Sequence, residues 1–250
     1  MKKIILSGCN GKMGRVITAC VEQRADCDII AGVDMNTEAK SDFVVYRSIA
    51  EYEGEADVII DFSHPSALDG LLAYAGARKL PIVLATTGYD KEQIAKIEAA
   101  SKEIPVFFSF NMSLGVNLLI ELAKKAAVVL GDQFDIEIVE KHHNQKVDAP
   151  SGTAIMLAEG INEARDHAYR YTYDRHSQRK KREPNEIGIQ SVRGGTIVGE
   201  HEVIFAGHDE LLTLTHTAMS KEIFATGAVN AAIFLSGKPA GFYNMGNLVE

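Results

Sequence analysis

The chain has 250 residues, of which 46% are hydrophobic, so it can form one large or two modest domains with a buried core. Its net charge of −8 and isoelectric point of about 5.5 exclude a general attraction to nucleic acid or to an anionic membrane. No apolar run reaches the length of a membrane span. The apolar run Ile4–Leu6 stops after three residues and a glycine follows soon after, which favours a buried first strand over a signal peptide. Cys9, Cys20 and Cys27 match no metal motif, so we expect free thiols in a reducing cytoplasm.

The first half of the chain alternates short apolar runs with helical patterns. Buried strands are expected at Ile4–Ser7, Ile29–Asp34, Val58–Phe62, Ile82–Ala85 and Val106–Ser109. Helices are expected at Lys12–Glu22, Ala67–Arg78 and Lys91–Ser101. This alternation predicts the α/β class, with a Rossmann-type doubly wound parallel sheet.

The second half changes character after a long helix expected at Ser113–Leu130. A strand at Phe134–Glu140 and a helix at Ser151–Ala164 precede three successive strands at Ile187–Val192, Thr196–Phe205 and Leu211–His216. Strands without intervening helices predict a second, α+β domain with a mixed sheet. With the final helix at Glu222–Leu235, we expect residues 1–112 and 222–250 to form one domain and residues 113–221 another.

A glycine-rich loop lies between the first strand and the first helix. Gly8, Gly11 and Gly14 are spaced as G-x-x-G-x-x-G, and Asp34 ends the second expected strand, 20 residues after Gly14. Glycines allow a backbone to approach a pyrophosphate, and an acid at that distance can hold ribose hydroxyls, so we expect dinucleotide binding rather than a plain turn. Asn10, Lys12 and Met13 belong to the same loop. Asp34 repels a 2′-phosphate and favours NADH, while the nearby Lys12 leaves NADPH open.

Three further segments follow the carboxyl ends of strands, where ligands bind in this architecture. They are Asp61-Phe62-Ser63, Ala85-Thr86-Thr87-Gly88 and Ser109-Phe110-Asn111-Met112. Each alone could be an ordinary turn. Together they favour a groove lined for a ligand.

The densest polar segment runs from Glu140 to Thr153 and contains His142, His143 and Lys146. Its Ser-Gly-Thr sequence can begin a helix whose N–H groups face an anion, so a small dicarboxylate suits the segment. A metal site is disfavoured because adjacent histidines rarely share one metal and no third ligand lies at ligand spacing. Ser151 lacks the surroundings of a nucleophile. Asp148 could orient Lys146 or a histidine, or only cap the turn, and we favour the structural role.

These segments resemble the dihydrodipicolinate reductases, also called 4-hydroxy-tetrahydrodipicolinate reductases. The resemblance rests on E-x-H-H-x-x-K-x-D-x-P-S-G-T at Glu140–Thr153, on Ser191–His201, and on the ends of the expected strands, and it runs nearly the whole chain. It implies reduction of 4-hydroxy-tetrahydrodipicolinate to tetrahydrodipicolinate by NAD(P)H in the diaminopimelate route to lysine. Ala85 stands where many relatives have glycine, and His64 and Lys221 stand where arginine occurs.

The resemblance also implies roles for individual residues. His142 and Lys146 would be the acid–base pair, and His143, Lys146, Gly152 and Thr153 would hold the substrate. The cofactor would contact the glycine loop, Asp34 and the strand ends, through Phe62, Ala85, Thr86, Thr87, Ser109, Phe110, Asn111 and Met112. The family is typically homotetrameric through the sheet of the substrate domain.

Other interpretations remain open from the residues alone. Another nicotinamide dehydrogenase acting on an amino-acid-derived imine, or a non-catalytic NAD(H) sensor, would share the first domain. The basic residues from Arg175 to Arg182 favour a solvated loop over a nucleic-acid site, because the chain is acidic and the segment has no recognition helix. Arg193-Gly194-Gly195 is typical of a hairpin turn.

Overall fold

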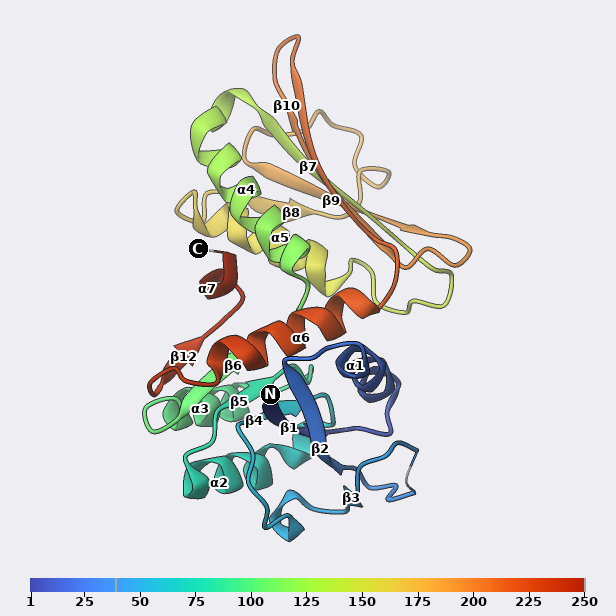
Figure 1. Ribbon diagram of the computed structural model, residues 1–250. Coiled ribbons are helices and arrows are strands. Elements are labelled where there is room, and N and C mark those ends of the chain that lie inside the picture. The colour runs from blue at the N-terminus through green and yellow to red at the C-terminus, as the bar shows by residue number, and fades with distance from the viewer. Residues whose placement is uncertain (39, 250) are drawn as a thin grey trace. The chain divides into compact units, whose positions relative to one another are not determined.

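The computed structural model describes residues 1–38 and 40–249 (Figure 1). The chain forms two compact units. The first comprises Met1–Leu114 together with the C-terminal residues from Lys221, and the second comprises Gly115–Ser220. In the described part of the chain, no helix is both long and apolar enough to cross a membrane.

The first unit is built on a parallel sheet, in which seven strands are described. Their spatial order is β12-β6-β5-β4-β1-β2-β3. The strands are β1 (Lys2–Ser7), β2 (Cys27–Val33), β3 (Val45–Tyr46), β4 (Val58–Asp61), β5 (Ile82–Leu84), β6 (Pro105–Phe108) and β12 (Gly241–Tyr243). Successive side chains of a strand point to opposite faces, so this sheet has two buried faces that need helices on both sides.

Both faces of this sheet are covered by helices that the sequence pattern predicts. Ile4 and Leu6 of β1 pack in one core with α1 (Lys12–Glu22) and α6 (Glu222–Leu235). Ile5 packs in the opposite core with α2 (Leu68–Arg78) and α3 (Lys91–Ala100). Short 3-10 turns at Ile49–Glu51 and Pro65–Ala67 and the helix α7 (Gly246–Val249) complete the unit. The doubly wound prediction is therefore confirmed.

The second unit is a mixed sheet with helices on one face. The five described strands lie in the order β11-β10-β7-β9-β8. They are β7 (Asp135–His142), β8 (Arg170–Thr172), β9 (Glu186–Arg193), β10 (Gly199–Ala206) and β11 (Leu211–Ala218). Both α4 (Leu114–Leu130), which a 3-10 turn at Gly131–Gln133 follows, and α5 (Gly152–Glu163) pack on this sheet. The predicted mixed sheet is confirmed.

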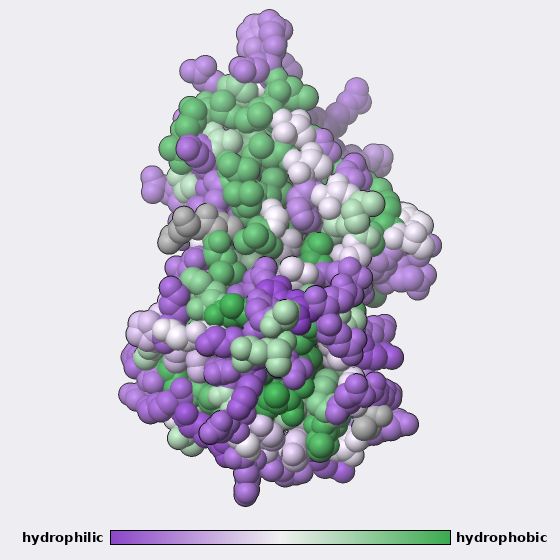
Figure 2. Space-filling model, viewed as in Figure 1, coloured by the Kyte–Doolittle hydropathy of each residue, from purple (hydrophilic) through white to green (hydrophobic). Residues whose placement is uncertain are grey.

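The second unit exposes apolar side chains at two places. On α4, Leu118, Leu122, Val128 and Val129 are between 45% and 74% exposed. Figure 2 shows apolar residues gathered over this helix. Leu211 and Leu212 are exposed on β11, which is an edge strand of the sheet. Apolar surface of this kind is typical of a face that meets another protein.

Several predictions about local structure are wrong. Arg193-Gly194-Gly195 is not a hairpin turn, because β7 lies between β9 and β10. The N–H of Gly194 instead bonds the carbonyl of His142 at 2.9 Å. β7 continues to His142, two residues past the predicted end, and β10 begins at Gly199, three residues late. The short elements β3, β8, β12 and α7 were not predicted because they are too short to carry a hydrophobic period.

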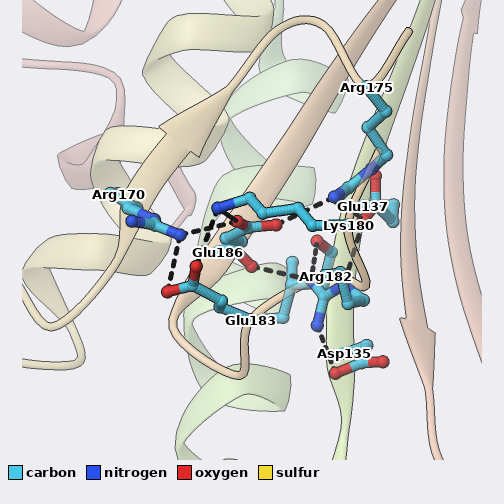
Figure 3. Close-up of polar contacts among 9 residues, drawn as sticks. Asp135, Glu137, Arg170, Arg175, Lys180, Arg182, Glu183 and Glu186 are labelled. Atoms are coloured by element: carbon cyan, nitrogen blue, oxygen red, sulfur yellow. Dashed lines mark hydrogen bonds and ion pairs between the residues drawn. The ribbon is translucent and has the colours of Figure 1, made fainter. Parts of the chain in front are cut away.

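The basic segment from Arg175 to Arg182 lies in a largely exposed loop, as expected, and several of its charges are paired. Arg175 bridges Glu137 and the buried Glu186, at 2.5 and 2.8 Å (Figure 3). Arg170, Lys180 and Arg182 also form ion pairs, with Glu183, Glu186, Asp135 and Glu137 as partners. The positive charges of these four residues are thus met by carboxylates of the same unit, which leaves little to attract a polyanion.

Candidate active site

The glycine loop forms a close-packed cradle at the carboxyl end of β1. Gly8 has a φ of +78°, and a Cβ on it would lie 2.5 Å from the carbonyl oxygen of Phe62. A Cβ on Gly14 would lie 2.2 Å from the carbonyl oxygen of Gly8. Gly11 caps α1 without a side-chain hydrogen bond, and the first turn of the helix has no acid. The loop therefore fits a pyrophosphate, which main-chain N–H groups and the helix dipole would hold.

Asp34 lies beside this loop and is held by it. Its carboxylate accepts the N–H of Asn10 and that of Asn36, both at 3.0 Å. The side chain of Asn10 reaches the carbonyls of Asn36 and Glu38 at 2.5 and 3.0 Å. The loop and the segment after β2 are thus tied together around one carboxylate.

A groove of about 470 Å³ begins at the loop, and Asp34 lines it. Gly8, Gly11, Phe62 and His64 also line it, on the side of the glycine loop and β4. Arg47 lines it as well. Sequence reasoning missed Arg47, because the strand that it follows, β3, has only two residues. The N–H of Asp34 bonds the carbonyl of Tyr46 at 3.0 Å, so the register of β2 with β3 brings Arg47 to the same end of the sheet.

A buried carboxylate organises the ends of β4 and β5. Asp61 accepts hydrogen bonds from the hydroxyls of Thr86 at 2.7 Å, Tyr89 at 3.2 Å and Ser63 at 2.5 Å. Thr86 is buried, whereas Thr87 is exposed. Among these predicted cofactor residues, Thr87 presents its side chain to solvent and Thr86 uses its hydroxyl to fix the loop. Asp61 itself was quoted in the sequence motif but given no role.

The segment after β6 also combines exposed and buried side chains. Phe110 is 49% exposed, and its ring meets that of Phe108 edge-on at 4.8 Å. The hydroxyl of Ser109 both donates to the carbonyl and accepts from the N–H of Asn111. Met112 and Ala85 are buried, Met112 in the core of the unit. The ring of Phe110 is therefore accessible from solvent, whereas the side chain of Met112 is enclosed in the core.

In the second unit, Glu140 is the centre of a second polar cluster. It is completely buried, and its carboxylate accepts a hydrogen bond of 2.6 Å from Nδ1 of His142. Arg193 donates to both carboxylate oxygens at 2.7 Å, and the N–H of Ser151 donates at 3.1 Å. Burial opposes the charge on Glu140, but the hydrogen bonds from Arg193 and His142 outweigh it and lower the pKa to about 2. Glu140 is therefore an ionised acceptor.

His142 is buried beside this carboxylate. Burial lowers its pKa below the ordinary value for histidine, although the hydrogen bond to Glu140 acts in the opposite direction. The neutral ring then carries its proton on Nδ1, toward Glu140, and presents Nε2 as an acceptor. A Cβ on Gly199 would lie only 3.1 Å from Nε2, so glycine at this position leaves room beside that atom.

Lys146 and His143 lie in the turn that follows. The carboxylate of Asp148 pairs with Nζ of Lys146 at 2.9 Å, so Asp148 is positioned to orient the lysine as well as to shape the turn. Nδ1 of His143 accepts the N–H of Gln145, and its carbonyl accepts the N–H of Lys146. These bonds shape the turn that carries both predicted substrate-binding side chains.

The start of α5 supplies the third part of the cluster. Ser151 caps the helix by accepting the N–H of Ala154, and its hydroxyl also contacts Nε2 of His201 at 2.9 Å. Burial lowers the pKa of His201 to about 3, so this ring is neutral. Gly152 and Thr153 are the first two residues of the helix, where its dipole favours an anion. The Ala149–Pro150 peptide bond before them is cis.

Both halves of the chain match models of one protein family. The family model described as the N-terminus of dihydrodipicolinate reductase matches residues 2–112, and the model of its C-terminus matches residues 115–249. The chain belongs to the dihydrodipicolinate reductase family.

In the described residues, no group of three or more histidine, cysteine, aspartate or glutamate side chains is arranged to hold a metal ion.

Individual members of the dihydrodipicolinate reductase family are similar over their full length. The 4-hydroxy-tetrahydrodipicolinate reductase of Caldanaerobacter subterraneus subsp. tengcongensis is 52% identical over all of this chain and 99% of the relative. That of Clostridium tetani is 51% identical over 98% of this chain and 96% of the relative. The dipicolinate-bound dihydrodipicolinate reductase from Paenisporosarcina sp. TG-14 has a TM-score of 0.82 at 23% identity, covering 98% and 97% of the two chains. That structure shows that the fold is shared.

Proposed function

We propose that this chain reduces 4-hydroxy-tetrahydrodipicolinate to tetrahydrodipicolinate in the diaminopimelate route of lysine biosynthesis, using NADH or NADPH. Full-length identity of about 50% to reductases of that name carries the assignment. It makes the chain an oxidoreductase, in which the first unit binds the cofactor and the second binds the substrate. The alternative of a non-catalytic sensor gives no purpose to the polar cluster around His142 and Lys146.

The cofactor supplies the hydride when it is bound. The cradle of Gly8, Gly11 and Gly14, with Asn10, Lys12 and Met13 beside it, would hold the pyrophosphate. Asp34 would accept the ribose hydroxyls, and the strand ends with Phe62, Thr87 and Phe110 would border the nicotinamide half. Ala85, Thr86, Ser109, Asn111 and Met112 would act through their main chain or by fixing these loops.

The groove has side chains that suit each form of the cofactor. The carboxylate of Asp34 disfavours a 2′-phosphate and so favours NADH. Arg47 lines the same groove and can pair with a phosphate, which supports the use of NADPH as well. His64, in place of the arginine of some relatives, lines the groove and bonds Ser66 at 2.9 Å.

The second unit would hold the dicarboxylate and manage its proton. The side chains of His143 and Lys146, with the N–H groups of Gly152 and Thr153, would bind the two carboxylates. Loss of the 4-hydroxyl group as water gives a ring carbon conjugated to an imine. Hydride addition to that carbon leaves negative charge along the ring, which the ammonium group of Lys146 would stabilise until a proton is added. A dianion beside His142 favours the protonated imidazole, so substrate binding would itself charge the ring and prepare Nε2 to donate a proton.

We also propose a cytoplasmic homotetramer. Cys9, Cys20 and Cys27 are free thiols, as expected in a reducing compartment. The exposed leucines of the edge strand β11 and the apolar face of α4 support association through the second unit. Light scattering coupled to size exclusion measures the assembly, and a monomer at micromolar concentration contradicts this part of the proposal.

The decisive experiment follows NADH oxidation with the substrate made in situ from pyruvate and aspartate semialdehyde by its synthase. The wild type should turn over, and His142→Gln with Lys146→Ala should not, while still binding NADH. Lys141→Ala is a matched control, because Lys141 lies on the same strand as His142 and pairs with Glu200. Absence of turnover with both NADH and NADPH, despite cofactor binding, overturns the proposed function.

A further inference from the structure

Two residues that the sequence motifs left without a role hold the polar cluster of the second unit together. Arg193 of β9 lies opposite His142 of β7 in the parallel register of the two strands. Glu140 lies two residues before His142 on the same face of β7. The carboxylate of Glu140 receives donors from three segments: the ring of His142, both terminal nitrogens of Arg193, and the N–H of Ser151.

Arg193 extends this connection to the turn that carries Lys146. One of its terminal nitrogens also donates to the carbonyl of Asp148 at 2.6 Å. The carboxylate of Asp148 in turn holds Lys146 at 2.9 Å. The Glu140–Arg193 pair thus joins the histidine, the lysine turn and the start of α5, which are the three parts that the proposed function assigns to the substrate.

We propose that the ion pair between the buried Glu140 and the partly buried Arg193 is a positioning device for the reduction. It fixes the orientation and tautomer of His142 and holds the Lys146 turn and the start of α5 in place beside the ring. This inference rests on the proposed function, because it takes His142 and Lys146 as the acid–base pair. Neither Glu140 nor Arg193 needs to touch the substrate.

The charge of Arg193 has a second consequence. An unneutralised carboxylate at 2.6 Å from Nδ1 would hold His142 as a permanent imidazolium, which could not release and regain its proton easily. Arg193 neutralises Glu140, and Lys146 adds a further positive charge near the ring. The other titratable group against the ring is His201, whose ring centroid lies 5.2 Å away and whose burial keeps it neutral. The carboxylate can therefore orient the ring without locking its charge.

Removing Arg193 and removing Glu140 should shift the pKa of His142 in opposite directions. Arg193→Met leaves the carboxylate of Glu140 unneutralised, so the pKa of His142 should rise by about one unit or more. Glu140→Gln removes the carboxylate and leaves Arg193, so the pKa should fall by a similar amount. The glutamine can also donate to Nδ1, which allows the other tautomer. The pKa of His142 in the double variant should lie between its values in the two single variants.

Histidine labelled with ¹³C and ¹⁵N in the ring allows both properties to be read by NMR without substrate. The signal of His142 is assigned by its loss in His142→Gln, its titration gives the pKa, and the ¹⁵N shifts give the tautomer. Arg175→Met is the matched control, because Arg175 also pairs with a buried glutamate of this sheet, at Glu186 rather than Glu140. It should leave His142 unchanged. Arg193→Lys keeps the charge but loses the fork, and should retain the wild-type pKa more closely than Arg193→Met.

Turnover provides the functional readout. The pH profile of kcat should move to higher pH in Arg193→Met and to lower pH in Glu140→Gln, with kcat at the wild-type optimum reduced about tenfold or more. NADH affinity should stay within about twofold. A loss of stability alone would lower the turnover of both variants without shifting their pH profiles in opposite directions.

The outcomes separate this inference from the function on which it rests. Midpoints of His142 that coincide in all variants, or that move in the same direction in both single variants, overturn the positioning role. If the titration midpoints diverge but His142→Gln keeps full turnover, the acid–base role of His142 in the proposed function fails. The Glu140–Arg193 pair then has no role in catalysis. If His142→Gln abolishes turnover and the midpoints coincide, the Glu140–Arg193 inference fails alone.

Discussion

Asn10 and Asp34 are joined by a hydrogen bond of 3.0 Å from the main-chain N–H of Asn10 to the carboxylate of Asp34. The carboxylate that lines the groove therefore also sets the position of the glycine loop. A single side chain thus links the pyrophosphate cradle to the proposed ribose site. Its removal should affect both at once.

Asp34→Ala should weaken NADH binding by about 10- to 100-fold, because charge-assisted hydrogen bonds to the ribose are worth about 1.5–3 kcal/mol. NADPH binding should fall less, since the repulsion of its phosphate disappears together with these bonds. Fluorescence titration with both cofactors measures the two affinities. Equal losses for NADH and NADPH would show that Asp34 acts only by shaping the loop.

Arg47→Met should lower the affinity for a 2′-phosphate by about tenfold, since it removes a charge-assisted partner. Calorimetry with 2′,5′-ADP and with 5′-AMP isolates this phosphate from the rest of the cofactor. Arg78→Met is the control, because Arg78 bonds the carbonyl of Gly54 and does not line this groove. An unchanged ratio of the two affinities in Arg47→Met rules out the contact.

Thr86→Val should destabilise the first unit by about 1–3 kcal/mol, because it leaves the buried carboxylate of Asp61 with one donor fewer. Tyr89→Phe removes a longer bond of 3.2 Å to the same carboxylate and should cost less. Urea denaturation of the two variants compares these costs. A larger loss in Tyr89→Phe would contradict the order that the distances indicate.

Ser151→Ala should cost about 1–2 kcal/mol, since it removes the cap of α5. The buried ring of His201 loses its hydroxyl partner in the same variant. Ser177→Ala, at an exposed site, should stay within about 0.5 kcal/mol of the wild type. Equal unfolding midpoints for the two variants would show that the cap is dispensable.

Glu186→Gln should flatten the loss of stability in acid. Hydrogen bonds from Arg175 outweigh burial and lower the pKa of Glu186 to about 2. A carboxyl with a folded pKa below its unfolded value stabilises the fold fully above about pH 4.5, and this contribution is lost as the pH falls toward about 2. Thermal melting between pH 5 and pH 2 tests this, with Glu159→Gln, at an exposed position on α5, as the control. Parallel curves for the wild type and Glu186→Gln would contradict it.

The sequence predicts most of the first unit because its strands and helices carry strong periods. The helices Lys12–Glu22 and Glu222–Leu235 have the predicted bounds. Arg47 could not be found in this way, because two-residue strands such as β3 have no period to detect. Its place at the same end of the sheet as Asp34 depends on the pairing of β2 with β3.

In the polar cluster of the second unit, too, some residues could be predicted from the sequence and others could not. Glu140 could have been assigned from its spacing, because residues i and i+2 of a strand share a face and His142 was already a candidate. Arg193 and His201 could not, since their approach requires the order β10-β7-β9, which places β7 between two strands that follow one another in the chain. The hairpin expected at Arg193 was wrong for that reason.

The first unit is assembled from both ends of the chain, and this has a consequence for synthesis on the ribosome. Ala225, Ala228 and Val229 of α6 complete the core that contains Ile4 and Leu6. Residues 115–220 emerge before α6 and bring their own core with them. The usual order, in which the N-terminal domain folds first, should therefore be reversed: the inserted unit can mature while the earlier strands still wait for the last helix.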